Sequence, residues 1–338
     1  MTMNRQWVLA RRPVGQVGLG DFARTDAEIP VPDLLKGEIL VRNRILGFDP
    51  AQRGWMDQGA GYMAPMALGE PVRGSACAEV IASQNPAYPV GSFVRGLFGW
   101  QDYAVVAKAG ETAPISVPEG VQPEEALGVL GAASLTAWAG IKTVGRVKSG
   151  DCVLVSGAGG AVGSMVVQIA RLNGARVIGI AGGAKKCRWL TQDYGTDAAI
   201  DYRTENVSAR LAELAPEGID LFFDNVGGDI LEAAIAHMAL HGRIVLCGSI
   251  SSYNDEQPAP GPRNLSRMIS YRLQMQGFIL LDHLDQVPQA SAELRNWLSA
   301  GQIRYRTDIQ HGFDAIPATF LRLFTGANQG KQLLTIDT

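Results

Sequence analysis

The sequence predicts an α/β protein in which a doubly wound parallel sheet is inserted into a second domain made mainly of β-strands. Residues 1–128 lack helical periodicity and are rich in glycine, proline and short β-type runs, which is typical of a compact β domain. From residue 129 onward, strand-like runs alternate with helix-like segments, as in a parallel sheet covered on both faces. After residue 301 the tail is again β-like. We therefore expect a first domain of residues 1–128 plus 302–338 and an inserted domain of residues 129–301.

The expected elements follow from apolar runs and their periodicity. In the first domain, the β-type runs are Glu38–Arg42, Ala78–Ala82, Gly91–Arg95 and Tyr103–Val106. In the inserted domain, strands are expected at residues 153–156, 176–180, 198–200, 220–224, 243–248 and 275–280, with a helix near 285–300. In the tail, we expect a strand at 302–306, a helix near 315–325 and a last strand at 332–336. A substrate is then expected in the cleft between the domains, at the carboxyl ends of the parallel strands.

The turn after the first strand of the inserted domain has the pattern of a dinucleotide-binding fingerprint. The apolar run 153–156 is followed by a glycine-rich turn and an amphipathic helix, which is the layout of a Rossmann βαβ unit. A tight turn, the approach of a pyrophosphate and close helix-on-strand packing each exclude large side chains at three positions, here Ala158, Gly160 and Gly163. The first N–H groups of the helix then face the phosphates. The cofactor-binding residues predicted from this turn are Ala158, Gly160, Ala161, Val162 and Gly163.

The residues after the second strand favour NADPH. Enzymes that use NAD usually place an acidic residue roughly 20 residues into the unit, where it binds the ribose 2′-hydroxyl. Here Gly182 and Gly183 follow the strand with no carboxylate to repel a 2′-phosphate, and Lys185 and Lys186 come next. Alternatively, the two lysines only solvate a helix start, but cations there oppose the helix dipole. We therefore expect NADPH as the cofactor.

Composition excludes several classes of function. The chain has 338 residues, 19% of them charged, and a net charge of −3, which argues against a nucleic-acid or anionic-membrane surface. No apolar run approaches the ~18 residues of a membrane span, and no secretory signal is expected. The four cysteines are scattered singly, as is usual for reduced thiols. We expect a cytoplasmic protein with no nucleic-acid or membrane partner.

The sequence lacks the usual patterns of a metal or nucleophile site. His237 and His241 lie four residues apart near an expected helix end, but no cysteine or glutamate accompanies them at ligand spacing. The other two histidines, His283 and His311, are isolated, and there is no Cys-x-x-Cys cluster. No Gly-x-Ser-x-Gly motif marks a serine nucleophile. A reduction that does not depend on a metal is therefore expected.

Tyr253 is the candidate catalytic residue. It ends the segment 247–253, which follows the fifth strand of the inserted domain and is expected to face the nicotinamide. A proline-rich, acidic loop at 254–262 follows and is suited to act as a lid. A phenol with an ordinary pKa of about 10 stays protonated at neutral pH and can donate a hydrogen bond to a developing enolate. Packing of the tyrosine under the loop is an equal alternative.

With these motifs in place, the chain resembles the zinc-independent medium-chain dehydrogenase/reductase superfamily. Within it, the chain is most similar to the group of leukotriene B4 12-hydroxydehydrogenase/prostaglandin reductase, alkenal double-bond reductases and curcumin-reductase-like enzymes. The resemblance spans nearly the whole chain. It is carried by Leu68–Pro71, the turn 157–163, Phe223–Gly228, Gly242–Tyr253 and Gly326–Lys331. It implies a Rossmann domain inserted into a GroES-like β domain.

The resemblance also implies an activity and a set of site residues. The activity is NADPH-dependent reduction of the C=C bond of an α,β-unsaturated ketone or aldehyde, with hydride transfer to the β-carbon and formation of an enolate. Tyr253 matches the family tyrosine on the substrate oxygen, Lys186 the lysine on the 2′-phosphate, and Tyr202 a tyrosine near the adenosine. The further cofactor contacts expected are Gly182, Asn225, Cys247, Gly248, Ser249, Ile250, Ser251, Ser252, Tyr253, Phe278, Ile279, Leu280 and Asn328. Family members are usually homodimers, which here implies pairing through the strand 275–280.

One departure concerns the substrate. Relatives commonly carry Asp-Pro-Tyr-Met-Arg where this chain has Asp49–Arg53, so that Ala51 replaces a pocket tyrosine and is expected to widen the pocket. The nearby apolar residues form either an adaptable wall or ordinary core; they are Trp55, Met56, Tyr62, Met63 and Met66. Two alternatives to an enone reductase remain open, a quinone reductase of the same superfamily and an NADPH-binding sensor without turnover.

Overall fold

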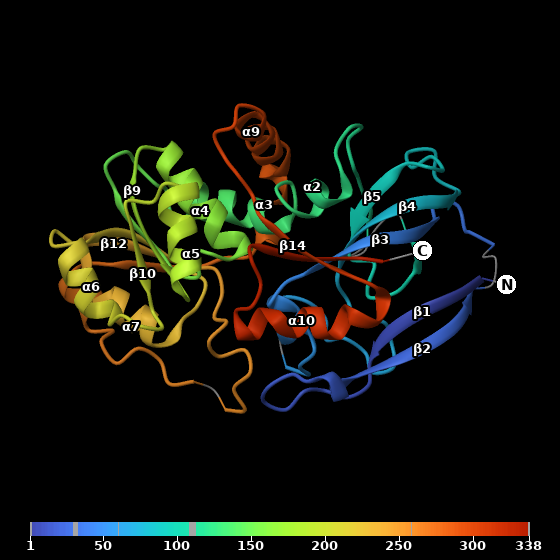
Figure 1. The fold of residues 1–338 in the computed structure, drawn as a ribbon, viewed down its shortest axis with the longest axis horizontal. Helices are drawn as coiled ribbons and strands as arrows, with labels where there is room; N and C mark the ends of the chain where they lie inside the picture. The colour runs from blue at the N-terminus through green and yellow to red at the C-terminus, as the bar shows by residue number, and fades with distance from the viewer. Residues whose placement is uncertain (1, 30–32, 60, 108–112, 258, 337–338) are drawn as a thin grey trace. The chain divides into compact units, whose positions relative to one another are not determined.

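The chain divides into two compact units. A computed structural model describes all residues except 1, 30–32, 60, 108–112, 258 and 337–338. One unit joins Met1–Leu127 with Thr307–Thr338, and the other is Gly128–Arg306 (Figure 1). Across the described residues, no helix combines the length and the apolar character that a membrane crossing requires.

The Gly128–Arg306 unit is built on a parallel sheet of six strands. In chain order these are β8 (Cys152–Val155), β9 (Arg176–Ala181), β10 (Ala198–Asp201), β11 (Ile219–Asp224), β12 (Met238–Leu246) and β13 (Gln274–Gly277). Their order across the sheet is β10-β9-β8-β11-β12-β13, and every neighbouring pair is parallel. The order reverses between β8 and β11, so this is a doubly wound sheet with its switch point there. The predicted parallel, doubly wound class is confirmed.

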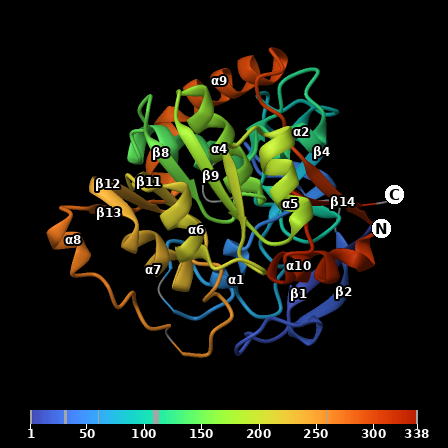
Figure 2. The same cartoon turned by 60° about the vertical axis from the view of Figure 1, so that its left-hand side comes forward.

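Helices cover both faces of this sheet, as Figure 2 shows for α4 and α9 above the strands and α6 and α7 below them. They are α3 (Ala132–Trp138), the π-helix η2 (Ala139–Val144), α4 (Ala161–Leu172), α5 (Ala184–Arg188), η3 (Trp189–Asp193), α6 (Val207–Leu214), α7 (Gly228–Ala236), α8 (Arg267–Ser270), η4 (Leu280–Gln286) and α9 (Val287–Ser299). Alternate strand residues, such as Ile178, Ile200 and Phe222, bury one face against Leu211 of α6 and Ile235 of α7. Burial on both faces explains why the strands are continuous apolar runs.

Two expectations about this unit were wrong. The strand expected at 275–280 ends at Gly277, because Phe278 leaves the ladder and packs its ring against Phe223, with the centroids 6.3 Å apart. The helix expected to hold both histidines ends at Ala236. His237 is its C-cap, whereas His241 lies in β12 with a φ of +65°, so the two imidazoles do not share a helix face.

The other unit is mainly antiparallel. Its seven-stranded sheet has the order β14-β15-β3-β4-β5-β7, with β6 also pairing β3, and β1 and β2 form a separate hairpin-like pair. The strands are β1 (Thr2–Leu9), β2 (Phe22–Ile29), β3 (Ile39–Phe48), β4 (Ser75–Ser83), β5 (Phe93–Gly96), β6 (Tyr103–Val106), β7 (Ile115–Ser116), β14 (Thr307–His311) and β15 (Lys331–Thr335). Its helices are η1 (Leu19–Asp21), α1 (Ala51–Trp55), α2 (Pro123–Leu127), η5 (Phe313–Ala315) and α10 (Ile316–Thr325).

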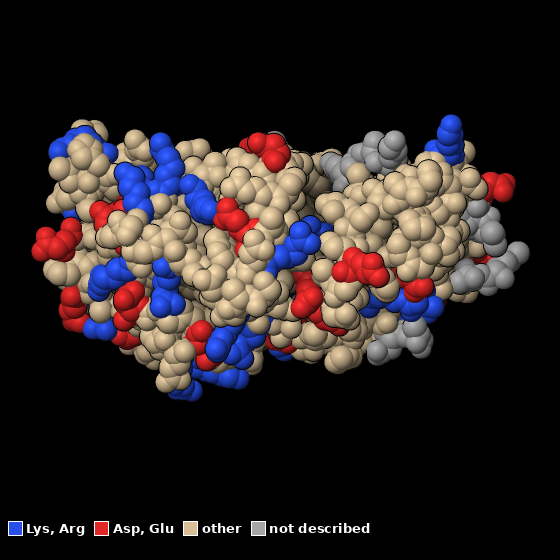
Figure 3. Space-filling view, turned by 90° about the horizontal axis from the view of Figure 1, so that it is seen from above, with Lys and Arg blue, Asp and Glu red and all other residues tan. Residues whose placement is uncertain are grey.

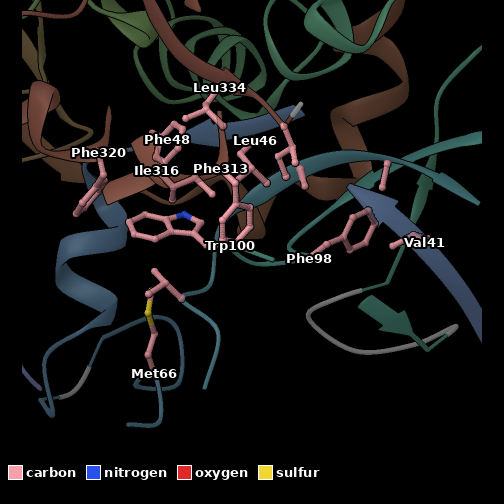
Figure 4. Packing of buried hydrophobic residues seen from close by; sticks show 14 of the residues in the cluster. Val41, Leu46, Phe48, Met66, Phe98, Trp100, Phe313, Ile316, Phe320 and Leu334 are labelled. Atoms are coloured by element: carbon pink, nitrogen blue, oxygen red, sulfur yellow. The ribbon is translucent and has the colours of Figure 1, made fainter. Parts of the chain in front are cut away.

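The core of this unit is organised around Trp100, which is fully buried. Its ring lies 5.6 Å from that of Phe48 and 5.4 Å from that of Phe320 (Figure 4). It also lies 5.2 Å from the ring of Phe22. These residues come from both ends of the chain, so the tail completes the core. The strand expected at 302–306 is wrong, because β14 begins only at Thr307, where it pairs in parallel with β15.

Candidate functional site

The turn between β8 and α4 is shaped by small residues. A Cβ atom on Gly163 would lie 2.4 Å from the carbonyl oxygen of Gly157 and 2.7 Å from the Cα atom of Ala158, so only glycine allows α4 to approach the turn. Gly160 is the N-cap of α4 and provides no side-chain cap, which leaves the first N–H groups of the helix available to a ligand. The predicted residues Ala158, Gly160, Ala161, Val162 and Gly163 are therefore brought together at one concave backbone turn.

The ends of β9 and β10 lie beside this turn. The aliphatic part of Lys186 covers Gly159, because a Cβ atom on that glycine would lie 3.1 Å from the Lys186 Cδ atom. A Cβ atom on Gly182 would lie 2.9 Å from the hydroxyl oxygen of Tyr202 and 3.0 Å from Nε of Arg203. The predicted residues Gly182, Lys186 and Tyr202 thus gather in one region, and the structure adds Arg203 to them.

The two neighbouring lysines have different surroundings. The ammonium of Lys185 lies over the ring of Trp189, 5.4 Å from its centroid, whereas Lys186 extends over the glycine turn between β8 and α4. Cation–π contacts of this kind stabilise by about 0.5–1 kcal/mol at exposed sites. The residue pattern after the strand did not distinguish the two lysines; in the structure Lys186 lies against Gly159 of the glycine turn and Lys185 against Trp189.

Asp201 is a functional candidate that the sequence analysis missed. It ends β10 and is 8% exposed, and its Oδ1 atom accepts hydrogen bonds from the N–H groups of Gly183 at 2.8 Å and Arg203 at 3.1 Å. Gly183 has a φ of +94°, a conformation that glycine adopts without strain. The stretch directly after β9 contains no carboxylate, as expected, but Asp201 approaches Gly183 from the neighbouring strand. The feature of the sequence that could have revealed this candidate is an acidic residue, Asp201, at the carboxyl end of the third strand of the parallel sheet.

The switch point is held by a buried carboxylate at the end of β11. Asp224 is fully buried and accepts hydrogen bonds from the hydroxyl of Ser156 at 2.6 Å and from the N–H groups of Val226 and Gly227 at 3.0 and 3.1 Å. Burial raises the pKa of Asp224, while these hydrogen bonds lower it. The predicted residue Asn225 is fixed by the same strand ends, because its side-chain amide donates to the carbonyl of Ser156 at 2.8 Å.

The loop after β12 is tied to the loop after β11. The N–H groups of Cys247 and Gly248 both donate to the carbonyl of Asp224, at 2.8 and 3.2 Å. The N–H and hydroxyl of Ser251 donate to the carbonyl of Val226, at 3.1 and 2.6 Å. The remaining predicted residues of this segment, Ser249, Ile250 and Ser252, lie in the same loop. Burial raises the pKa of the Cys247 thiol to about 12, so this thiol is neutral at physiological pH.

Tyr253 folds back over the start of its own segment. Its hydroxyl oxygen accepts a hydrogen bond from the N–H of Ser249 at 3.2 Å, and a Cβ atom on Gly248 would lie 3.2 Å from the same oxygen. Burial raises the pKa of the phenol, and the Ser249 hydrogen bond partly opposes this. Because the hydroxyl uses only its acceptor side in that bond, its proton remains available for donation.

Phe278, Ile279 and Leu280 follow β13 directly. The N–H of Phe278 still donates to the carbonyl of Leu246 at 3.4 Å, which places this segment beside the end of β12. A Cβ atom on Gly140 of the π-helix η2 would lie 2.4 Å from Cζ of Phe278, so the ring position depends on that glycine. These predicted contacts therefore flank the Cys247–Tyr253 loop, although they are not part of a strand as expected.

Asn328 is not brought to this cluster within one unit. It belongs to the unit with Thr307–Thr338, where its side-chain amide donates to the carbonyl of Gly330 at 2.9 Å. In the same unit, the buried Lys331 forms an ion pair with the partly exposed Asp49 at 2.6 Å, beside the position where Ala51 begins α1. Of the apolar residues expected near the substrate, Met56 and Met66 belong to the buried core, which favours their packing role.

Possible metal ligands are scattered among the described residues. No group of three or more histidine, cysteine, aspartate or glutamate side chains in that part of the chain is arranged to hold a metal ion. On the face shown in Figure 3, basic and acidic side chains are interspersed, with several basic groups close together on its left-hand side.

Comparison with known proteins shows to which family the chain belongs. Residues 5–114 match a family model described as the N-terminal domain of oxidoreductase, and residues 161–296 match one described as zinc-binding dehydrogenase. The chain is 35% identical to the NADPH-dependent curcumin reductase of Escherichia coli, over 98% of this chain and 97% of the relative. It is 36% identical to the NADP(+)-dependent 2-alkenal reductase of Nicotiana tabacum, over 89% of this chain and 88% of the relative.

A solved structure agrees in fold as well as sequence. The crystal structure of CurA from Vibrio vulnificus in complex with NADPH has a TM-score of 0.92 and 38% identity, and 99% of each chain is covered. The expected combination of a Rossmann domain and a GroES-like domain is confirmed. The chain belongs to the zinc-independent medium-chain dehydrogenase/reductase family, in the group of the curcumin, 2-alkenal and prostaglandin reductases.

Proposed function

We propose that this chain catalyses the NADPH-dependent reduction of the C=C bond of α,β-unsaturated ketones and aldehydes. The observation that carries the proposal is the tethering of the Tyr253 loop, through Asp224, to the glycine turn at the switch point. A hydrogen-bond donor is thus held on the same sheet edge as a dinucleotide cradle. The relatives named for curcumin and 2-alkenal reduction support the substrate class.

The backbone of the turn fits a dinucleotide. The space that a Cβ atom on Gly163 would fill is taken by the carbonyl of Gly157, and Gly160 leaves the start of the twelve-residue helix α4 uncapped by a side chain. This arrangement suits a pyrophosphate. We propose that Lys186 and Tyr202 bind the adenosine end, and that Asn225, the 247–252 loop and Phe278–Leu280 position the nicotinamide end. Asn328 is proposed as a further contact.

The chemistry divides between the cofactor and the protein. When bound, the cofactor supplies a hydride to the β-carbon of the substrate. Negative charge then develops on the carbonyl oxygen, and the Tyr253 hydroxyl is proposed to donate a hydrogen bond to it. Burial raises the pKa of this phenol, so it stays protonated and able to donate throughout the physiological range.

The activity is tested with a panel of acceptors. Purified protein is mixed with NADPH and either trans-2-hexenal, curcumin or 1,4-naphthoquinone, and both NADPH oxidation and loss of the conjugated absorbance of the enal or enone are followed. We expect one NADPH to be consumed for each double bond reduced. Turnover confined to the quinone would favour the quinone-reductase alternative, and NADPH binding without turnover of any acceptor would favour the sensor.

We also propose that the protein forms a homodimer through β13. This strand is an edge of the parallel sheet, and apolar side chains near it are exposed, including Ile269 at 81% and Leu240 at 53%. Pairing of two such edges satisfies their backbone groups. Light scattering coupled to size exclusion should give the mass of two 36.1 kDa chains, and a single-chain mass would contradict the proposal.

The free cysteines are consistent with the proposed cytoplasmic location.

A further inference from the structure

Gly140 lies in a π-helical turn, and its surroundings leave no room for a side chain. The π-helix η2 continues directly from α3, and the carbonyl of Gly140 accepts a hydrogen bond from the N–H of Gly145, five residues later, at 2.8 Å. Such turns are rare within α-helices and are frequent at functional sites. A Cβ atom on Gly140 would lie 2.4 Å from Cζ of Phe278 and 2.6 Å from Cε2 of Phe223. Two phenyl rings therefore occupy the space that a side chain at this position would need.

The ring of Phe278 is held by contacts from three segments of the Gly128–Arg306 unit. It packs edge-on against Phe223, with the ring centroids 6.3 Å apart, and against His283, with the centroids 6.0 Å apart. Its Cζ and Cε1 atoms face Gly140. Because closely packed groups shift together, a methyl group added at position 140 would displace this ring.

The position of this ring sets the course of the chain that follows it. The pairing of β13 with β12 ends one residue before Phe278. The N–H of Phe278 still donates to the carbonyl of Leu246 at 3.4 Å, and the carbonyl of Ile279 then accepts a hydrogen bond within a turn. Ile279 and Leu280 thus leave the sheet directly after the residue whose ring lies against Gly140. The proposed function assigns these two residues to the nicotinamide end of the cofactor.

We propose that Gly140 is a positioning residue for the nicotinamide: it leaves room for the ring of Phe278 and thereby sets the place of Ile279 and Leu280. This role rests on the proposed function and deepens it, and Gly140 lies between the two spans, 5–114 and 161–296, that match family models. A shift of the ring would pass to the next two residues, because the backbone joins them to it and no ladder holds them. A misplacement of about 1 Å can slow a reaction about 100-fold.

The binding of two ligands tests the proposal without turnover. NADPH carries the nicotinamide, whereas adenosine 2′,5′-bisphosphate lacks it, and calorimetry measures both affinities. For Gly140→Ala we expect about a tenfold loss of affinity for NADPH and less than about a twofold loss for the bisphosphate, because only the nicotinamide end is displaced. The single-turnover rate of hydride transfer to trans-2-hexenal should fall about 10- to 100-fold. An equal loss of both ligands, or no loss of either, would overturn the inference.

A second substitution separates the two rings that face Gly140. Phe278→Leu removes the Cζ and Cε1 atoms that lie nearest to the added methyl group. Gly140→Ala combined with Phe278→Leu should therefore bind NADPH at least about threefold more tightly than Gly140→Ala alone. A methyl group that acted through Phe223, or by loosening the fold, would leave the double variant no better than the single one, and this result would contradict the proposal.

Gly18→Ala is the matched control, because a Cβ atom there meets no atom within 4 Å and the residue belongs to the other unit. We expect it to leave both affinities within about twofold. Phe278→Ala carries the test if Gly140→Ala does not fold, since it removes the ring without adding an atom to the π-helix. It should lose affinity for NADPH and keep that for the bisphosphate, and an unchanged affinity for NADPH would overturn the inference. An unmodified protein that binds NADPH but reduces no acceptor would instead contradict the proposed function.

Discussion

The side chain of Tyr253 is half-buried, and its hydroxyl proton is not used in the hydrogen bond with Ser249. Its oxygen accepts from Ser249, and no side-chain carboxylate is hydrogen-bonded to it among the described residues. The raised pKa makes it a donor rather than a base at neutral pH. The two neighbouring lysines also differ in their contacts. Lys185 packs on Trp189, whereas Lys186 covers the glycine turn. Three predictions follow from these side chains.

Replacement of Tyr253 by phenylalanine should lower kcat for trans-2-hexenal about 10- to 100-fold, because one donor to the developing oxyanion is lost. NADPH affinity, measured by fluorescence titration, should change less than about twofold. Tyr271→Phe is the control, since this tyrosine is stacked by Arg267 in the same unit and is not part of the proposed site. An unchanged kcat in Tyr253→Phe would remove the tyrosine from the mechanism.

The pH profile gives an independent reading of the same group. A donor must be protonated, and because burial raises the pKa of Tyr253, activity should persist up to a pH above the ordinary phenol value of about 10. The profile of kcat/KM between pH 6 and 11 measures this for the free enzyme. An alkaline loss centred well below pH 10 that is absent from Tyr253→Phe would show that the phenol ionises too early to act as proposed.

Lys186→Ala should weaken NADPH binding by about tenfold and NADH binding by much less, since one charge-assisted contact to the 2′-phosphate is removed. Lys185→Ala is the matched control, because it removes the same charge from a side chain that lies on Trp189. Both variants are titrated with each nucleotide. Similar losses in the two variants, or for the two nucleotides, would contradict the separation of the lysines seen in the structure.

At the scale of elements, the site depends on how closely α4 approaches the turn that precedes it. The contact between Gly163 and the backbone of Gly157 and Ala158 leaves no room for a methyl group. Backbone atoms cannot rotate away as a side chain can, so any added group must move the helix or the turn. Gly140 differs, because the atoms nearest to its Cβ position belong to the side chains of Phe278 and Phe223.

Gly163→Ala should therefore cost about 1–3 kcal/mol in the free energy of unfolding and should weaken NADPH binding at least as strongly. Urea denaturation and fluorescence titration measure the two effects. Gly54→Ala in α1 is the comparison, because a Cβ atom there meets no atom within 4 Å and alanine favours helix. A Gly163→Ala protein with normal stability and binding would mean that the turn adapts freely.

At the scale of the whole molecule, binding and folding are linked. A ligand that binds only the folded state raises its stability by about 2.7 kcal/mol at a hundredfold excess over Kd. We expect NADPH to raise the melting temperature and NADH to do so less at equal concentration. Incubation with EDTA should leave both activity and melting temperature unchanged. Inhibition by EDTA that added zinc reverses would contradict a reaction that does not depend on a metal.

The sequence predicted the features that depend on neighbouring residues. The strands β8, β9, β10 and β11 were found because each is a short apolar run, and the turn before α4 because its three small residues have fixed spacing. Two features that the sequence did not predict depend on contacts between distant segments. Phe278 leaves the sheet because Gly140 and Phe223 offer it a packing site, and Asp201 reaches Gly183 only because β10 lies beside β9.

The hydrogen bond from Gly183 to Asp201 also bears on attempts to redesign the nucleotide preference. One loop supplies the glycines and Lys186, the next supplies Tyr202 and Arg203, and a shared carboxylate oxygen sets the conformation of both. An acidic residue grafted into the first loop alone would lie near the carboxylate of Asp201 and would leave the second loop unchanged. A switch to NADH therefore requires the two loops to be exchanged together, as one module.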